Sequence, residues 1–558
     1  MEDESLKVFS NRSAITKMQA AVIGVIIVVA AIAGVVYYVY YLPPPAPSEE
    51  ITLRVGFAWP TYNDPAVGND MSASSILCNL YDPLVWPTPA GDVDPWVAES
   101  WTGSPDGLVW TFTIRTGIKF HTGNELTAED VAFSLERMLT IGEGYSYLFT
   151  PYIDTVEVVD GDKVKITLKK TFGPFLISLV RLYVLEKEEV MANIKTPGPY
   201  GEFGDYGKEW LLMHDAGSGA YTLVDGKLED WFRMEKFEDY WEEFAPNAPT
   251  DVTYLWTSAT PPTTRTMMET RELEVTDQWM PAEILEALDA VEGISFVSFV
   301  PGTQEYYYML NTQKPPLDDV HFRKALAYCM DYEALMEEIY YRYTLATSSV
   351  PKGIPGYKDT QIYHLDLAKA EEELALSKYA ANYTDYTIKF HWISEVPERE
   401  RDALFFAEQA AKIGVNVEVV KTPWTLTLEE MAEIETSGHI YNILVAAHYP
   451  EAGGMLEARY HSAAAASWEQ NEWLLDPVLD AMIEDAIATV DMDERLAKYG
   501  ELQEHIMDLC PSLFIYDFAC TVAVQDYVDW PAMKDPSKVS PVMGYNFVHR
   551  LWSVSPPE

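Results

Sequence analysis

Cysteine is scarce in this chain: four occur among 558 residues, at positions 78, 329, 510 and 520. None of the four stands in the close pairs that a structural zinc site requires. Cys510 and Cys520 flank an apolar stretch that predicts a strand over 512–518. Because a strand rises by about 3.3 Å per residue, it would hold these two thiols beyond disulfide reach. We therefore expect free, buried thiols, and the cysteine count identifies no redox compartment.

Positive charge is also in short supply. Lys and Arg number 39 against 87 Asp and Glu, which gives a formal net charge of −48 at pH 7. A surface of this sign repels phosphates and excludes a nucleic-acid partner. The acidity is typical of a solvated surface. A chain of this length with 48% hydrophobic residues can bury a large core in two or more lobes.

Motifs that carry chemistry are missing as well. The chain has no nucleophile elbow, zinc-protease helix or phosphate-binding loop. The glycines of 217–219 lack the following Lys-Ser/Thr of a phosphate loop and predict a tight turn before a strand. The closest histidines, His439, His448 and His461, have a spacing that suits no single element. We expect no catalytic residues, no metal and no cofactor.

Only one long hydrophobic run is present. Residues 18–42 carry no charge and are long enough to cross roughly 30 Å of hydrocarbon as a helix. Basic residues precede the run and none follows it within 43–50, so residues 1–17 are expected in the cytoplasm and the bulk outside. The Pro-rich segment 43–50 predicts a stiff linker. We expect a single-pass anchor in the cell membrane, with the ligand-binding part on the outer face.

Two other interpretations of this run stay open. One is a cleaved signal peptide, although no clear small-residue cleavage site follows the apolar stretch. The other is processing near Lys17-Met18 by a prepilin-type peptidase. No cysteine stands just after the run, which excludes a bacterial-type lipoprotein anchor.

The stretch 81–139 holds the most specific pattern in the sequence. A Pro/Gly/Asp turn leads to a piece that we interpret as helical and ending near Trp101. Residues 109–115 alternate and predict a strand, and Thr127 with acids at 129 and 130 predicts a helix start. A hairpin over 156–170 and an apolar helix over 172–182 should follow.

This order resembles the family 5 solute-binding proteins of ABC importers, which bind oligopeptides, dipeptides or nickel and include archaeal sugar-binding relatives. The positions that carry the resemblance are Tyr81-Asp82-Pro83-Leu84, Ala98-Glu99-Ser100-Trp101, Asp106-Gly107, Thr111-Phe112, Lys119-Phe120-His121, Gly123 and Thr127-Ala128-Glu129-Asp130-Val131. Further matches are Gly217-Ser218-Gly219-Ala220-Tyr221, Asn311, Pro315-Pro316-Leu317, Asp319 and Arg323. The resemblance covers about residues 51–558.

The family implies an α/β, two-lobed periplasmic-binding-protein-like fold of type II with an extra domain in lobe one. The implied boundaries are 51–80, 217–302 and 511–558 for lobe one, 81–216 for the extra domain and 303–510 for lobe two. Within lobe two, the pattern of 386–420 predicts a strand, a helix and a parallel strand. A helix over 429–436, a strand over 441–446 and two helices over 476–509 should follow.

The resemblance implies that function is non-covalent capture of a solute, with delivery to the permease subunits of an ABC importer by a monomeric receptor. In peptide binders of the family a Trp lines the pocket, and Trp424 matches it. The same binders carry an Asp that pairs with the peptide ammonium, and His448 stands at that position here. His448 carries no permanent negative charge, so we expect an oligosaccharide rather than a peptide, unless Glu451 replaces the missing acid.

Five further positions complete the predicted ligand site. Tyr449 neighbours His448, and Trp59 and Trp279 lie in loops placed toward the cleft. Tyr306 and Tyr308 share one face of a strand, and one of them is expected to line the cleft. A peptide-specific binder of the same family is the first alternative, and a surface-anchored hydrolase is the alternative from another class.

Overall fold

The computed structural model describes residues 50–57, 62–228, 230–256, 261–278, 280–299, 304–340, 343–394, 396 and 398–555. The predicted membrane segment 18–42, Trp59 and Trp279 lie outside these residues. In the part of the chain that is described, no helix is long and apolar enough to cross a membrane. Residues 51–558 form one compact unit.

The first sheet is built from strands that come from both ends of the chain. Its strand order is β1-β10-β9-β8, with β1 parallel to β10 and the other pairs antiparallel. Single bridges at Val275 connect β1 to β18, which pairs with β11. The strands are β1 Thr52–Phe57, β8 Tyr221–Lys227, β9 Trp231–Lys236, β10 Asp251–Trp256, β11 Ile294–Phe299 and β18 Cys520–Gln525.

A second, antiparallel sheet has the order β4-β5-β7-β6. Its strands are β4 Ala98–Gly103, β5 Val109–Ile114, β6 Ile153–Val159 and β7 Lys163–Leu168. The predicted strand at 109–115 and hairpin at 156–170 are confirmed. The predicted helical piece ending near Trp101 is wrong, because Trp101 pairs with Phe112 across β4 and β5.

Helix α3, Ala128–Ile141, begins where the sequence predicts. Thr127 and Asp130 form a capping box, and Gly142 ends the helix in the left-handed conformation with φ 72°. The expected helix at 172–182 is short, with α4 at Phe175–Ser178 and a 3₁₀ turn at Leu179–Arg181.

Asp82 joins segments that lie far apart in the sequence, among them the Gly217–Tyr221 stretch of the family resemblance. Its buried carboxylate accepts hydrogen bonds from the indoles of Trp96 at 2.8 Å and Trp241 at 3.2 Å. Ser218 and Tyr240 donate to the same group at 2.9 and 3.0 Å. Burial raises the pKa of Asp82, while these donors hold it down. The motif of 81–84 therefore organises the fold locally.

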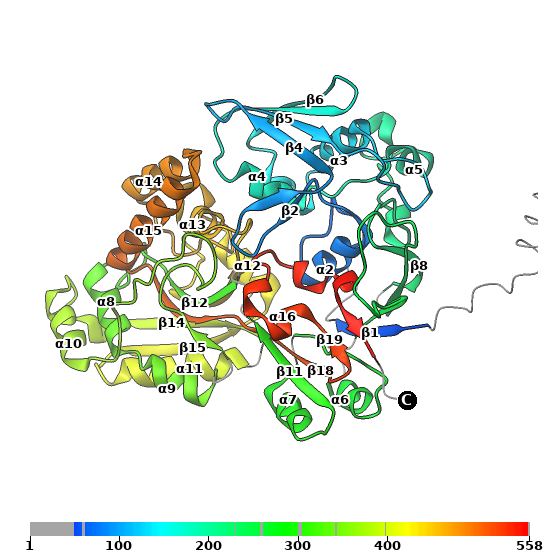
Figure 1. The fold of residues 1–558 in the computed structure, drawn as a ribbon. Helices are drawn as coiled ribbons and strands as arrows, with labels where there is room; N and C mark the ends of the chain where they lie inside the picture. Colours follow the sequence, from blue (N-terminus) through cyan, green and yellow to red (C-terminus); the bar gives the residue numbers. More distant parts are fainter. Residues whose placement is uncertain are drawn as a thin grey trace, which may run out of the picture. The chain divides into compact units, whose positions relative to one another are not determined.

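The third sheet has the order β13-β17-β12-β16-β14-β15. Strands β14, β15 and β16 are mutually parallel, and β12 is antiparallel to β16 and β17. The helices α8 to α11 gather around β14 and β15 (Figure 1). The strands are β12 Gln304–Leu310, β13 Thr344–Leu345, β14 Thr387–Ile393, β15 Asn416–Thr422, β16 Ile440–Ala446 and β17 Ser512–Asp517.

The predicted β-α-β unit of 386–420 is confirmed, since α11 connects the parallel strands β14 and β15. Two boundaries differ from expectation. Helix α12 spans Trp424–Met431 and not 429–436. It begins directly after Pro423, because a proline is tolerated just before the first turn of a helix. Strand β17 pairs with β12, so the chain leaves this sheet after Asp517 rather than at 511.

Helices α14 and α15 match the two predicted over 476–509 and pack side by side (Figure 1). All four cysteines are free and buried, as expected. The remaining helices are α2 Met71–Leu80, α5 Lys187–Ala192, α6 Pro261–Glu269, α7 Ala282–Asp289, α8 Val320–Cys329, α9 Tyr332–Glu338, α10 Leu367–Leu376, α11 Glu398–Ala411, α13 Gly453–Tyr460, α14 Pro477–Ala488, α15 Met492–Leu509 and α16 Pro531–Lys534. The remaining strands are β2 Val85–Pro87, β3 Val93–Pro95, β19 Val528–Asp529 and β20 Ser553–Val554.

Candidate functional site

Three parallel strands of the six-stranded sheet end at one edge. Trp424 follows the end of β15 at Thr422, and His448 follows the end of β16 at Ala446. In open α/β sheets, ligands bind in the crevice beyond the carboxyl ends of parallel strands. The sheet therefore brings these two predicted site residues to the edge where a ligand is expected.

The chain passes between the two sheets at this same edge. Strand β12 begins at Gln304 opposite Ala446, and β17 ends at Asp517 opposite Glu305. Only Phe518 and Ala519 separate Asp517 from Cys520, where β18 begins in the first sheet. Short crossovers of this kind keep the two edges close and can act as a hinge.

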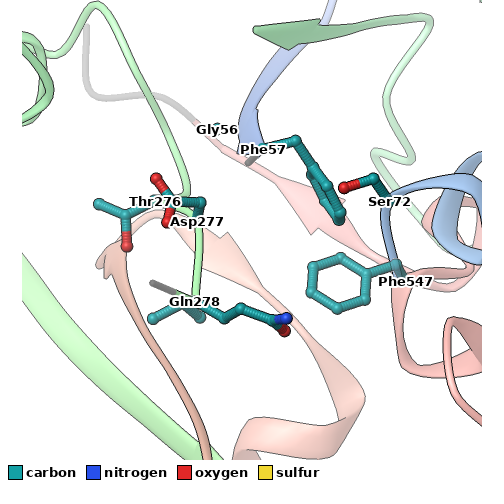
Figure 2. Close-up of a pocket in the computed structure, with 8 residues that line it drawn as sticks. Gly56, Phe57, Ser72, Thr276, Asp277, Gln278 and Phe547 are labelled. Carbon is teal, nitrogen blue, oxygen red and sulfur yellow. The ribbon is translucent and has the colours of Figure 1, made fainter. Parts of the chain in front are cut away.

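The first sheet presents its own carboxyl edge at a small pocket. Figure 2 shows the rings of Phe57 and Phe547 with the Ser72 hydroxyl on one side, and Asp277 and Gln278 on the other. Its cavity of about 10 Å³ holds no more than one water molecule. Trp59 and Trp279 follow Phe57 and Gln278 in the sequence, and their predicted contacts stay predictions.

His448 is held by an acid from a distant segment. Its Nε2 lies 2.9 Å from Oε1 of Glu469, and the two side chains are 24% and 18% exposed. The ring of Tyr147, which is 38% exposed, stands edge-on to the imidazole with centroids 4.6 Å apart. The carboxylate of Glu469 thus lies beside His448, the position at which peptide binders of the resembled family carry an Asp.

Trp424 is the first residue of α12 and is partly buried. Its ring lies 5.8 Å from that of Trp468 in a T-shaped arrangement. Trp468 immediately precedes Glu469 in the loop between α13 and α14. Two indoles and an acid–histidine pair therefore come from the start of α12 and from the segments after β16 and α13.

Glu451 and Tyr449 are core residues in the structure. Arg495 donates to both oxygens of Glu451, from Nε at 2.9 Å and Nη2 at 2.7 Å. The buried ring of Tyr449 packs against Phe172 at 5.6 Å. Because Arg495 already neutralises Glu451, this acid is not available as the replacement carboxylate that the sequence left open.

Tyr306 and Tyr308 share one face of β12, as predicted, but both are fully buried. Their hydroxyls donate to Asp402 of α11 at 2.5 and 3.2 Å. Burial raises the pKa of Asp402 to about 7, against the effect of these donors. The hydrogen bonds of Tyr306 and Tyr308 connect α11 to the sheet, and neither ring is exposed at the carboxyl edge.

A buried charged cluster at the same edge was not found from the sequence. Arg459 of α13 donates to Glu305 and to the carbonyl of Ser349, and it stacks over the Tyr307 ring at 3.5 Å. Glu472 and Asp517 complete the cluster, and burial raises the pKa of Glu305 and Glu472 to about 7 and of Asp517 to about 8. The four residues lie in separate segments, so no local pattern marks them.

Among the described residues, no group of three or more His, Cys, Asp or Glu side chains could hold a metal ion. The protein has two sheets whose carboxyl edges adjoin and carry aromatic side chains. This arrangement is that of an α/β protein of the two-lobed periplasmic-binding type.

Comparison with known proteins gives the family. Residues 92–467 match the family model described as "Bacterial extracellular solute-binding proteins, family 5 Middle". The chain therefore belongs to the family 5 extracytoplasmic solute-binding proteins of ABC importers.

Three individual similarities agree with this. The dipeptide-binding protein of Escherichia coli (strain K12) is 28% identical over 480 residues, 80% of this chain and 85% of that protein. Heme-binding protein A of Haemophilus influenzae is 27% identical over 473 residues, 80% of this chain and 82% of that protein. The structure of the ABC transporter-associated periplasmic binding protein DppA from Helicobacter pylori, in complex with peptide STSA, has a TM-score of 0.71 at 22% identity. The alignment with that structure covers 90% of this chain and 98% of the DppA chain.

Proposed function

We propose that this chain captures an extracellular solute between the carboxyl edges of its two sheets and delivers it to the permease subunits of an ABC importer. The observation that carries the proposal is the short connection from Asp517 of β17 to Cys520 of β18, which joins the two sheets at the edge where β16 ends before His448. Closure about such a connection shifts the population toward the ligand-bound state.

The solute is proposed to be a peptide or an oligosaccharide. Relatives named for dipeptide and glutathione binding support the peptide class. The indoles of Trp424 and Trp468 support the oligosaccharide as second candidate, since an indole stacks on a sugar face. We also propose that residues 18–42 anchor a monomeric receptor, with lobe two running from 303 to the end of β17 and the extra domain from 81 to 216.

The test is a calorimetric titration of the full chain in detergent micelles with di-, tri- and tetra-alanine and with maltose, cellobiose and their trimers. We expect one class to bind with micromolar affinity, which corresponds to about −8 kcal/mol. Trp424→Ala should weaken binding about tenfold, which is typical for removing a stacking side chain.

Trp101→Phe is the matched control, because Trp101 lies on β4 against Phe112, and it should leave the affinity unchanged. The ligand should be recovered intact after prolonged incubation. No binding of either class contradicts the proposal. Turnover of a ligand at catalytic protein concentrations would instead support the hydrolase.

A further inference from the structure

We propose that Asn382 is N-glycosylated on the outer side of the membrane, by transfer of an oligosaccharide from a lipid-linked donor. The sequence Asn382-Tyr383-Thr384 is an acceptor motif, because a hydroxyl stands two residues after an asparagine with no proline between them. Within the described part of the chain this motif occurs only here. The inference goes beyond solute capture and rests on the extracytoplasmic placement proposed above.

The structure leaves both recognition groups of this motif accessible to solvent. Asn382 and Thr384 are exposed, and neither side chain forms a hydrogen bond or an ion pair with another described residue. The middle residue, Tyr383, is half-buried, and its hydroxyl donates to the carbonyl of Ile413 at 3.3 Å. The turn is therefore held through Tyr383, while the amide and the hydroxyl that a transferase reads stay free.

Main-chain hydrogen bonds shape the segment that carries the acceptor, which connects α10 to β14. The N–H of Asn382 donates to the carbonyl of Tyr379 at 2.9 Å, and the N–H of Asp385 donates to the carbonyl of Asn382 at 3.0 Å. None of these bonds uses the side-chain amide. A bulky, hydrated group on that amide therefore displaces no packed side chain and breaks no hydrogen bond.

The transfer replaces one bond at the anomeric carbon of the first sugar by another. The side-chain nitrogen Nδ2 of Asn382 forms the new bond to C1, and the bond from C1 to the oxygen of the lipid phosphate breaks. The lipid phosphate leaves with the bonding electron pair, and the amide gives up one proton. Nothing is oxidised or reduced, so the lipid-linked oligosaccharide is the only co-reactant.

The acceptor lies at the edge of the third sheet that is opposite to the proposed solute site. Asn382 precedes the start of β14 at Thr387, and this strand of seven residues ends at Ile393. A strand of that length spans about 20 Å. Trp424 and His448 follow the far ends of the parallel strands β15 and β16. A glycan on Asn382 therefore leaves solute capture unobstructed.

A second acceptor motif in the sequence gives an internal reference for orientation. Asn11-Arg12-Ser13 has the same pattern and precedes the hydrophobic run 18–42. The basic residues before that run place this motif on the cytoplasmic side. A transferase that acts outside the membrane therefore modifies Asn382 and does not reach Asn11.

The test is peptide mass spectrometry of the full chain purified from the membranes of its own organism. We expect the peptide that contains Asn382 to carry the mass of an oligosaccharide and to release sugar oxonium ions on fragmentation. The peptides that contain Asn11 and Asn416 should carry no added mass. Asn416 is the matched control, because it is exposed at the same edge of the sheet but has Glu418 in place of the hydroxyl residue.

Three variants expressed in the same organism separate the motif from its surroundings. Thr384→Ala and Asn382→Gln should lose the modification completely, whereas Thr384→Ser should keep it, because serine retains the hydroxyl. The solute affinity of Asn382→Gln should equal that of the native chain. Circular dichroism establishes that each variant is folded.

An unmodified Asn382 in the native chain overturns the inference, as does a modification that persists in Thr384→Ala. Modification of Asn11 in place of Asn382 overturns both the inference and the proposed orientation. A glycosylated chain that binds neither peptides nor oligosaccharides supports the inference and overturns the receptor function alone.

Discussion

In the described part of the chain, burial raises the pKa of four carboxyl groups to near neutrality. Burial raises the pKa of Glu305, Asp402 and Glu472 to about 7 and that of Asp517 to about 8. Glu305 lies opposite Asp517 across β12 and β17, and its charge adds to the rise for Asp517. The guanidinium of Arg459 lowers the pKa of Glu305 and Glu472 against the effect of burial, whereas Lys352 does so for Asp517.

At the residue scale this predicts that stability falls as pH rises. A carboxyl group with a raised folded-state pKa binds more protons in the folded than in the unfolded chain, so its stabilisation is lost as pH climbs through the folded value. Burial lowers the pKa of His391 and His439 to about 4, an opposite effect that is largely expressed by about one pH unit above the unperturbed value of about 6.5. Urea unfolding should therefore show a decline between about pH 6.5 and 8.5, of roughly 1 kcal/mol per group.

Asp517→Asn removes the group with the highest of these values and should flatten the decline. Asp239→Asn is the control, because Asp239 forms only an exposed ion pair with Lys119, and it should leave the pH profile unchanged. Stability that stays constant or increases from pH 6.5 to 8.5 in the native chain would contradict the prediction.

At the scale of elements, tertiary packing determined the secondary structure of segments whose sequence suits both helix and strand. The segment ending near Trp101 became strand β4 because β5 offers it a partner, with Thr102 facing Thr111. A tight turn was predicted at 217–219, but the structure has irregular backbone there with a bend only at 219–220, and the reason for the glycines is close approach of the backbone. A Cβ at Gly217 would lie 1.9 Å from the carbonyl oxygen of Leu80 at the end of α2.

Gly217→Ala should therefore destabilise the protein by about 2–3 kcal/mol, because backbone cannot move aside as a side chain can. Gly500→Ala is the control. A Cβ there would meet only the flexible side chain of Lys358 at 3.1 Å, inside α15 where alanine is the better helix former. Denaturant unfolding of both variants measures the difference, and an equal effect of the two would refute the role of close approach.

At the scale of the whole molecule, the net charge of −48 opposes the compact state through self-repulsion. Salt screens this repulsion over a Debye length of about 10 Å at 0.1 M. We expect the melting temperature to rise by several degrees between low and high ionic strength, measured by scanning calorimetry of the full chain.

Sodium chloride and choline chloride should give the same rise, because screening depends on ionic strength and not on the identity of the cation. A rise with sodium alone would indicate specific cation binding instead. A melting temperature that falls with both salts would show that exposed ion pairs such as Lys227–Asp230, and not net repulsion, dominate the electrostatics.

The sequence alone determined the family, the strand at 109–115, the hairpin at 156–170, the β-α-β unit of 386–420 and the free cysteines. These features depend on local periodicity, turn residues and caps, which act over a few neighbours. The tertiary structure decided what the site residues do. It buried Tyr306 and Tyr308 beneath Asp402, paired Glu451 with Arg495, and brought Glu469 to His448. Such pairings depend on which segments meet at a strand edge, and no pattern within a single segment carries that information.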